Sequence, residues 1–259
     1  MSLDGATELS ELSKLPEPDA IVFDLDGTLV DTVDTRIEGW LDTFREASIP
    51  ANRDALAALI GSDGKRLARE IAALAGRSLE EADTERLDAR AGELYDRRNI
   101  DPRPLPGAHD LLTALAASDL PWAIATSSRR EQVSRSVEAL MLPQAPRIVD
   151  GSHVEHAKPA PDLLLLSAER LGKDPAACWY VGDATWDMLS AVAAEMVAIG
   201  METGAVDGRA LREAGAAVSL RRLEDLQGEL SRRGRLPARP GEAPREPPRE
   251  ARTPANPLG

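Results

Sequence analysis

The chain has 259 residues, more than the ~100–200 residues typical of one domain, so one large or two unequal domains are expected. Hydrophobic residues make up 42% and charged residues 29%, which excludes a wholly disordered or fibrous chain. A net charge of −13 disfavours nucleic acid or an anionic membrane as partner. The single cysteine, Cys178, excludes a disulfide framework and a multi-cysteine zinc site.

The two ends of the chain differ from its middle. No stretch approaches the ~20 apolar residues of a membrane span, and the acidic, polar N-terminus is unlike a signal peptide, so a cytoplasmic protein is expected. Residues 1–16 are predicted to be a flexible segment. Residues 232–259 hold seven prolines and seven arginines without an apolar period, and such a composition predicts a disordered tail.

Between these ends, strand and helix signals alternate. Short, nearly continuous apolar runs, typical of strands buried on both faces of a parallel sheet, occur at residues 20–24, 122–126, 178–183 and 196–200. Helical patterns separate them, at residues 107–118, 129–140, 161–171, 184–195 and 208–214. The alternation predicts an α/β fold with a doubly wound parallel sheet, similar to the Rossmann fold.

One interval breaks the alternation. Only helical segments follow the first strand, at residues 35–47, 53–60, 65–74 and 79–98, before the proline-rich run P-R-P-L-P-G. We therefore predict an inserted all-helical cap domain over residues 34–103, and a core formed by residues 17–33 and 104–231.

The first expected strand ends in D-L-D-G-T-L-V-D-T, which contains Asp24, Asp26, Gly27 and Thr28. Carboxylates two residues apart on an extended segment point the same way, and Gly27 permits a sharp turn after them. Such a pair suits a divalent metal, or a nucleophile beside an acid/base. Solvated aspartates in a turn are the alternative.

Three further signals follow later strands. A-T-S-S-R-R places Thr126, Ser127 and the amides of the next helix where an anion binds, although these residues also suit helix capping. H-A-K-P-A-P-D places Lys158 before a proline turn, where a lone lysine is usually solvated. In G-D-A-T-W-D, Asp183 and Asp187 are positioned to face one cation, or Asp183 caps the following helix.

These four motifs, in this order and each at an expected strand end, resemble the haloacid dehalogenase superfamily of phosphatases and phosphomutases. The helical insertion resembles the branch that contains phosphoglycolate phosphatase and β-phosphoglucomutase. The likeness covers residues 19–222. Ala157 and Ala184 stand where this superfamily often has glycine and serine, and neither departure changes a functional side chain.

The resemblance implies a role for each motif residue. Asp24 is the expected nucleophile, which forms an aspartyl-phosphate, and Asp26 the expected acid/base. Thr126 and Lys158 complete the expected catalytic set and stabilise the phosphoryl oxygens. The expected cofactor is Mg²⁺, held by Asp24, Asp26 through its backbone carbonyl, Asp183 and Asp187, the last of which either holds a metal-bound water or supports Lys158.

The resemblance also implies that the helical cap closes over the site and chooses the substrate. The segment L-I-G-S-D-G-K-R-L presents Lys65 and Arg66 at a helix start, where the helix dipole disfavours cations. They are candidates for binding an anionic substrate group, with surface decoration as the alternative, and Arg36 is a weaker candidate. The expected substrate-binding residues are Thr28, Ser127, Arg129, Lys65 and Arg66.

The resemblance favours a Mg²⁺-dependent phosphomonoester hydrolase, a monomer or homodimer, that acts on a small phosphorylated metabolite. A phosphomutase is the nearest alternative. Mutases of this branch carry a histidine on the first cap helix where this chain has Arg36, which favours the phosphatase. A non-catalytic protein that binds phosphate or Mg²⁺ is a further alternative. It would be expected to have lost a motif side chain, and all are present.

Overall fold

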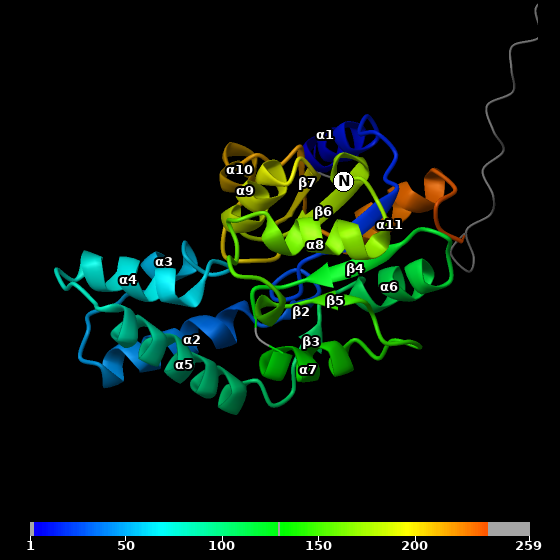
Figure 1. The fold of residues 1–259 in the computed structure, drawn as a ribbon. Coiled ribbons are helices and arrows are strands. Elements are labelled where there is room, and N and C mark those ends of the chain that lie inside the picture. The colour runs from blue at the N-terminus through cyan, green and yellow to red at the C-terminus, as the bar shows by residue number, and fades with distance from the viewer. Residues whose placement is uncertain (1–2, 129, 238–259) are drawn as a thin grey trace, which may run out of the picture.

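A computed structural model describes residues 3–128 and 130–237, and its centre is a six-stranded parallel sheet (Figure 1). The strands, in their order across the sheet, are β5 (Ile148–Val149), β4 (Trp122–Ala125), β1 (Ala20–Phe23), β6 (Cys178–Gly182), β7 (Val197–Met201) and β8 (Val218–Leu220). The four strands expected from the sequence are present, and β5 and β8 at the sheet edges were not predicted. The parallel α/β fold is thereby confirmed.

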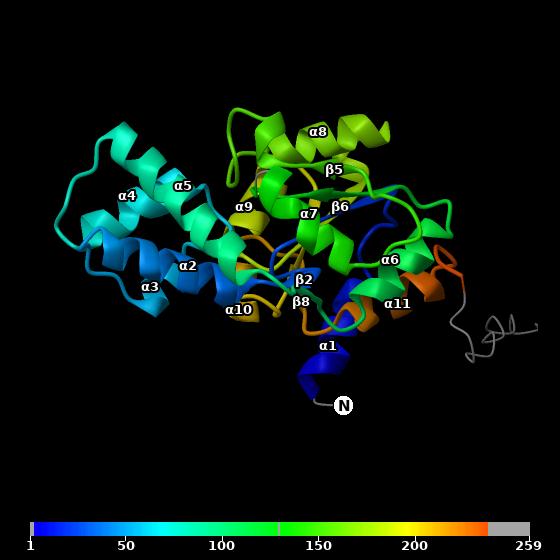
Figure 2. The ribbon, with the colours of Figure 1, turned by 90° about the horizontal axis from the view of Figure 1, so that it is seen from below.

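Helices cover both faces of this sheet (Figure 2). One face packs against α1 (Leu3–Leu12), α6 (Ala108–Ala116), α7 (Arg130–Ala139) and α11 (Leu223–Arg232). The other packs against α8 (Asp162–Leu171), α9 (Thr185–Ala193) and α10 (Gly208–Glu213). Two short 3-10 helices, η1 (Gly151–His153) and η2 (Pro175–Ala177), complete this body.

Strand β1 shows why the apolar runs are continuous. Ile21 and Phe23 are buried in the cluster on one face, and Ala20 and Val22 in the cluster on the other. Because successive side chains of a strand point to opposite faces, a strand covered on both sides needs apolar residues at every position. Cys178, at the start of β6, is fully buried in the second cluster, as expected of a core residue.

A helical cap follows β1 and stands apart from the body (Figure 1). It consists of α2 (Val33–Glu46), α3 (Arg53–Ala57), α4 (Gly64–Leu74) and α5 (Glu81–Arg98). These helices share a separate apolar core that includes Phe44, Leu56 and Leu67. A small antiparallel ribbon of β2 (Val30–Asp31) and β3 (Arg103–Pro104) pairs the two connections between cap and body.

Both ends of the body are more ordered than the sequence predicted. Residues 1–16 were expected to be flexible, but α1 occupies part of them and Leu12 is fully buried in the core. The predicted tail begins at residue 232, yet Leu236 is only 5% exposed and packs against the same core. Apolar side chains at these few positions find a surface that only the folded body provides. Residues 238–259 lie outside the described residues.

Within residues 3–128 and 130–237, no helix combines the length and the apolar character needed to cross a membrane.

Candidate active site

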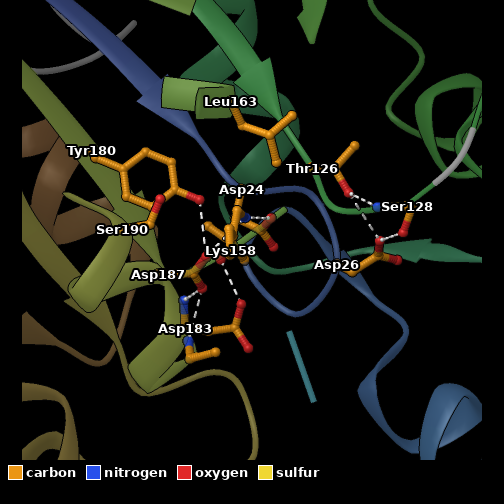
Figure 3. A network of polar contacts seen from close by, with 12 residues as sticks. Asp24, Asp26, Thr126, Ser128, Lys158, Leu163, Tyr180, Asp183, Asp187 and Ser190 are labelled. Atoms are coloured by element: carbon orange, nitrogen blue, oxygen red, sulfur yellow. Dashed lines mark hydrogen bonds and ion pairs between the residues drawn. The ribbon is translucent and has the colours of Figure 1, made fainter. Parts of the chain in front are cut away.

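The motif residues meet at one edge of the sheet, where β1, β4 and β6 end. These three parallel strands are neighbours, and Phe23 pairs in register with Ile124 on one side and Val181 on the other. The residues just after these strands, among them Asp24 and Thr126, are therefore brought side by side (Figure 3). Ligands of open α/β sheets bind beyond this edge.

Lys158 lies at the centre of the site. Its side chain is 1% exposed, and its ammonium forms an ion pair with Asp24 and a second, of 2.8 Å, with Asp187 Oδ1 (Figure 3). Burial opposes the charged form, but the carboxylates of Asp187 and Asp24 outweigh it and raise the pKa of Lys158. Lys158 is therefore a fixed buried cation and not the solvated lysine that local sequence favours.

Asp187 holds this lysine through a saturated carboxylate. Oδ2 accepts hydrogen bonds from the amides of Asp183 (3.1 Å) and Ala184 (2.9 Å), and Oδ1 accepts one from the Tyr180 hydroxyl (2.9 Å). Both oxygens are thus engaged by the protein, with Lys158 as a further partner of Oδ1. This arrangement supports the second of the two roles expected for Asp187, the positioning of Lys158.

Asp24, Asp183 and Asp187 form a buried group of carboxylates, each offering an oxygen within 4.8 Å of the others. Burial, against the attraction of Lys158, raises the pKa of Asp24 to about 7. Burial together with Asp187 and Asp24 raises the pKa of Asp183 well above its usual value. Such mutual repulsion is relieved by a hard divalent cation, which prefers oxygen ligands, so the donor set fits Mg²⁺.

The turn after β1 brings the chain close to Asp183. The Thr28 hydroxyl donates to Asp183 Oδ1 at 2.7 Å, so Thr28 positions this carboxylate. Gly27 has a φ of +88°, and a Cβ there would lie 2.3 Å from Asp183 Oδ2. Only glycine satisfies both the left-handed conformation and this close approach.

The Asp26 side chain points away from the carboxylate group and toward the cap (Figure 3). Its oxygens accept hydrogen bonds from Ser128 (2.6 Å) and Thr32 (2.8 Å), and Arg36 Nη2 forms an ion pair with it at 3.0 Å. Burial opposes ionisation of Asp26, but Arg36 and the two hydroxyls outweigh it and lower its pKa.

The loop after β4 forms the opposite wall. The Thr126 hydroxyl accepts a hydrogen bond of 3.1 Å from the backbone amide of Ser128, and this bond closes a tight turn. Ser127 lines the cavity, and its buried hydroxyl has no hydrogen-bond partner among the described residues. Arg129, expected to bind substrate, lies outside the described residues.

Body and cap enclose a cavity of about 480 Å³ above Asp24. Lys65 lines it, but its ammonium forms an ion pair with Glu81 at 2.9 Å. Arg66 is not among the lining residues, and it pairs with Glu70 at 2.7 Å. The cap therefore neutralises both cations that the sequence singled out.

Contacts across the junction hold the cap against the body. The Trp186 indole donates to the carbonyl of Ala58 at 3.1 Å, and the Arg66 guanidinium stacks 4.4 Å from the Trp186 ring. Gly61 has a φ of +90°, and a Cβ there would lie 2.8 Å from the Cβ of Ala184. These contacts join the cap to the body at the side of the site formed by Ala184 and Trp186.

Two residues beside Asp26 were not predicted to lie there: the sequence offered Arg36 only as a weaker candidate for substrate binding and gave no indication of Tyr95. The Tyr95 hydroxyl donates to Asp26 at 3.2 Å, and the Arg36 guanidinium stacks 4.1 Å from the Tyr95 ring. Arg36 lies in the first turn of α2, directly after the connection from body to cap, and this position was visible in the sequence. Tyr95 lies on α5, far along the chain, and nothing local distinguishes it from a core residue.

A doubly wound sheet with aspartates and a buried lysine at its carboxyl edge, closed by a helical cap, defines a class of phosphoryl-transfer hydrolases. The family described as haloacid dehalogenase-like hydrolase matches residues 21–201. The chain belongs to this family, and the resemblance of its motifs is confirmed.

Individual relatives agree with this assignment. A probable phosphatase, IndB, from Dickeya dadantii is 34% identical over 192 residues, covering 71% of this chain and 81% of the relative. The fructose-1-phosphate phosphatase YqaB from Escherichia coli is 32% identical over 186 residues, which cover 69% of this chain and 94% of the relative. The crystal structure of a hydrolase from Pseudomonas syringae is 31% identical, has a TM-score of 0.77, and covers 82% of this chain and 98% of that one. The protein is a phosphatase of this family.

Proposed function

We propose that the protein is a Mg²⁺-dependent phosphomonoester hydrolase that acts on a small phosphorylated metabolite through an aspartyl-phosphate. The observation that carries this proposal is the buried Lys158, which forms ion pairs with Asp24 and Asp187, two aspartates that line the cavity together with Asp183. A buried cation and a group of carboxylates together suit a dianionic phosphoryl group and a divalent metal.

Asp24 acts as the nucleophile, because its carboxylate lies at the cavity floor and Lys158 holds one of its oxygens. In-line attack of Asp24 on phosphorus forms the acyl phosphate and releases the alkoxide, and water then hydrolyses the phosphoenzyme. Lys158, Thr126 and Ser127 stabilise the phosphoryl oxygens. Ser127 is suited to this contact, since its buried hydroxyl lacks a partner among the described residues.

Asp26 acts as the acid/base. It lies two residues beyond Asp24 and lines the same cavity. Its lowered pKa favours the ionised form, which takes a proton from the water that attacks the phosphoenzyme. In the preceding step Asp26 acts as the acid: it takes up a proton from solvent when substrate enters and its contact with Arg36 weakens, and it passes this proton to the departing alkoxide.

The cation would be held by Asp24, Asp183 and the backbone carbonyl of Asp26. When bound, it supplies positive charge that offsets the charge on the phosphoryl oxygens. Asp187 positions Lys158 through its saturated carboxylate, and Thr28 positions Asp183.

The phosphomutase alternative is disfavoured by the contacts of Arg36. A mutase must keep its phosphoenzyme from water long enough to return the phosphoryl group. Here the cap residue beside the acid/base is an arginine that holds Asp26 ionised, which is the form that activates water. The non-catalytic alternative is disfavoured because Asp24, Asp26, Thr126 and Asp183 line one cavity, and the buried Lys158 contacts Asp24 beneath it.

The test is phosphate release from a panel of phosphomonoesters, including an aryl phosphate, with Mg²⁺ and with a chelator. We expect turnover only with the metal and none by Asp24→Asn. Absence of phosphate release from every ester in the presence of Mg²⁺, with folded protein, would overturn the proposal. Transfer of phosphate to a second sugar hydroxyl would favour the mutase.

A further inference from the structure

Tyr180 places a hydroxyl group deep inside the body, next to the candidate active site. The residue lies on β6, pairs in register with Val22 of β1, and is fully buried in the apolar cluster that packs against α8 and α9. The fold requires only an apolar side chain at this position, since both faces of the strand are covered. A hydroxyl buried there costs stability unless it has a partner.

The partner of this hydroxyl is the carboxylate that holds Lys158 (Figure 3). The Tyr180 hydroxyl donates to Asp187 Oδ1 at 2.9 Å, and Lys158 Nζ lies 2.8 Å from the same oxygen. The other oxygen, Oδ2, accepts hydrogen bonds from the backbone amides of Asp183 and Ala184. With Oδ2 fixed by the backbone and Oδ1 by Tyr180, the carboxylate is held against rotation, and so is the ammonium that binds to it.

The aromatic ring of Tyr180 contacts the other member of this ion pair. Its centroid lies 5.3 Å from Lys158 Nζ, within the range of a cation–π interaction. One side chain thus donates a hydrogen bond to Asp187 and offers its ring to the ammonium that Asp187 holds. Phenylalanine at this position would keep the ring contact and remove only the hydrogen bond.

The hydroxyl remains a donor. Burial, with the nearby Asp187 carboxylate acting in the same direction, raises the pKa of Tyr180 well above its ordinary value. The phenol therefore stays protonated, and its proton is directed at Asp187.

The backbone near Lys158 is held by a separate contact. The buried Ser190 hydroxyl donates to the carbonyl of Ala160 at 2.8 Å. Ser190 follows Asp187 by three residues on α9, so this helix holds both the loop that carries Lys158 and the lysine ammonium. Loss of the Tyr180 hydroxyl should therefore leave the loop in place and affect only the side-chain pair.

The contact between Lys158 and Asp187 has to persist while the contact between Lys158 and Asp24 changes. In the proposed reaction the Asp24 carboxylate forms a bond to phosphorus, and the resulting acyl phosphate carries its charge on the phosphoryl oxygens. Lys158 then loses the carboxylate charge of Asp24, and Asp187 remains as its paired carboxylate until water restores Asp24. A carboxylate fixed at both oxygens keeps the ammonium at one position through both steps.

We propose that Tyr180 is a positioning residue for phosphoryl transfer: its hydroxyl fixes Asp187, so that Lys158 keeps its place beside Asp24 through both steps of the reaction. It acts through these residues and not on the substrate, since Asp24 and Asp187 line the cavity and Tyr180 is not part of the described lining. The inference rests on the proposed phosphatase function and adds to it a residue that lies outside the four motifs.

The test is Tyr180→Phe, measured on 4-nitrophenyl phosphate and phenyl phosphate, which share the phosphoryl group and differ in the acidity of the leaving phenol. We expect kcat to fall about 10- to 100-fold, by the same factor on both esters, as for loss of a hydrogen bond to a charged group. KM should change less than about twofold, because Tyr180 does not contact the substrate. Orthovanadate, a mimic of the transferring phosphoryl group, should inhibit more weakly by about the factor lost in kcat.

Two control variants separate this role from others. Tyr95→Phe removes the hydroxyl of the other tyrosine of the chain, which donates to Asp26 at 3.2 Å. Its kcat/KM should fall more on phenyl phosphate, because the poorer leaving group depends more on the acid. Trp179→Phe removes a buried hydrogen bond of the residue next to Tyr180, from Nε1 to the carbonyl of Pro16. It should lower the melting temperature and leave kcat and orthovanadate inhibition unchanged.

The outcomes separate the two proposals. A Tyr180→Phe protein with a lowered melting temperature but wild-type kcat and orthovanadate inhibition would overturn the inference and assign the tyrosine to packing. A loss confined to phenyl phosphate would also overturn it, since the effect would then arise at the leaving group. Failure of this variant to fold would do the same, because the hydroxyl would then serve stability. Absence of phosphate release by the wild-type protein would instead count against the phosphatase function.

Discussion

Arg36 of the cap and Asp26 of the body form an ion pair, with 3.0 Å between Nη2 and Oδ2, and both residues line the cavity. In the chain, Asp26 precedes and Arg36 follows β2, which belongs to the ribbon that connects the body to the cap. The pair therefore couples the position of the cap to the orientation of the proposed acid/base, so that Asp26 is fully oriented only when the cap is closed.

We expect Arg36→Ala to lower kcat about 10- to 100-fold, as for loss of a contact to a charged group worth ~1.5–3 kcal/mol. Arg36→Lys should recover part of this loss, because it restores the charge without the guanidinium geometry. The measurement is steady-state kinetics on an aryl phosphate. Equal kcat for all three proteins would show that Arg36 does not position Asp26.

Asp24→Asn should lower turnover by at least about 10³-fold while the protein remains folded, because it removes the nucleophile. Lys158 keeps its ion pair with Asp187 in this variant, so its charge stays compensated. Phosphate release and circular dichroism check the two halves of this prediction. A folded variant with nearly full turnover would contradict the assignment of Asp24.

Mg²⁺ should raise the melting temperature, since a bound ion stabilises the folded state, and Asp183→Asn should weaken this shift. Metal-free, the pKa of Asp24 is raised to about 7 and that of Asp183 is also raised. The two carboxyls therefore contribute their full stabilisation of the folded state below pH ~4, where both are protonated, and this contribution is lost as pH rises through ~7. The Mg²⁺ shift should thus be larger at pH 8 than at pH 5, as thermal scans can test. Equal shifts at both pH values, or in the variant, would place the cation elsewhere.

Trp186→Phe should lower kcat/KM about 2- to 10-fold, because the closed state loses a hydrogen bond to Ala58 worth ~0.5–1.5 kcal/mol. The control is Trp122→Phe, since Trp122 packs edge-on against Phe23 within the body and has no contact with the cap among those described. Kinetics on a metabolite ester and melting curves distinguish the two. A loss of stability without a kinetic effect in Trp186→Phe would assign this residue to packing alone.

Two truncations should behave differently. Ending the chain after Pro237 should leave the melting temperature nearly unchanged, because the Pro/Arg-rich composition beyond it buries little apolar surface. Ending it after Ser231 removes Arg233, which donates to the carbonyls of Leu12 and Leu15, and the buried Leu236. Loss of one buried leucine costs ~1.5–3 kcal/mol, so the melting temperature should fall by roughly 5–10 °C. Identical melting curves would show that residues 232–237 do not stabilise the body.

Much of the fold was predictable from local sequence because its signals are local. Continuous apolar runs identified β1, β4, β6 and β7, since strands covered on both faces need apolar residues throughout. The edge strands β5 and β8 are two and three residues long, too short to show a period. Helix α1 and Leu236 were missed because their burial depends on a surface formed by distant elements.

The motifs alone identified which residues gather at the strand ends, because parallel strands place their carboxyl ends at one edge. What they do there was decided by tertiary contacts. Lys158 reads locally as solvated, and only the sheet brings it to Asp24, 134 residues away, where ion pairs offset its burial. Asp26 turns toward Arg36 because the cap supplies that cation. Glutamates of the cap likewise neutralise Lys65 and Arg66, which sequence alone presents as free charges.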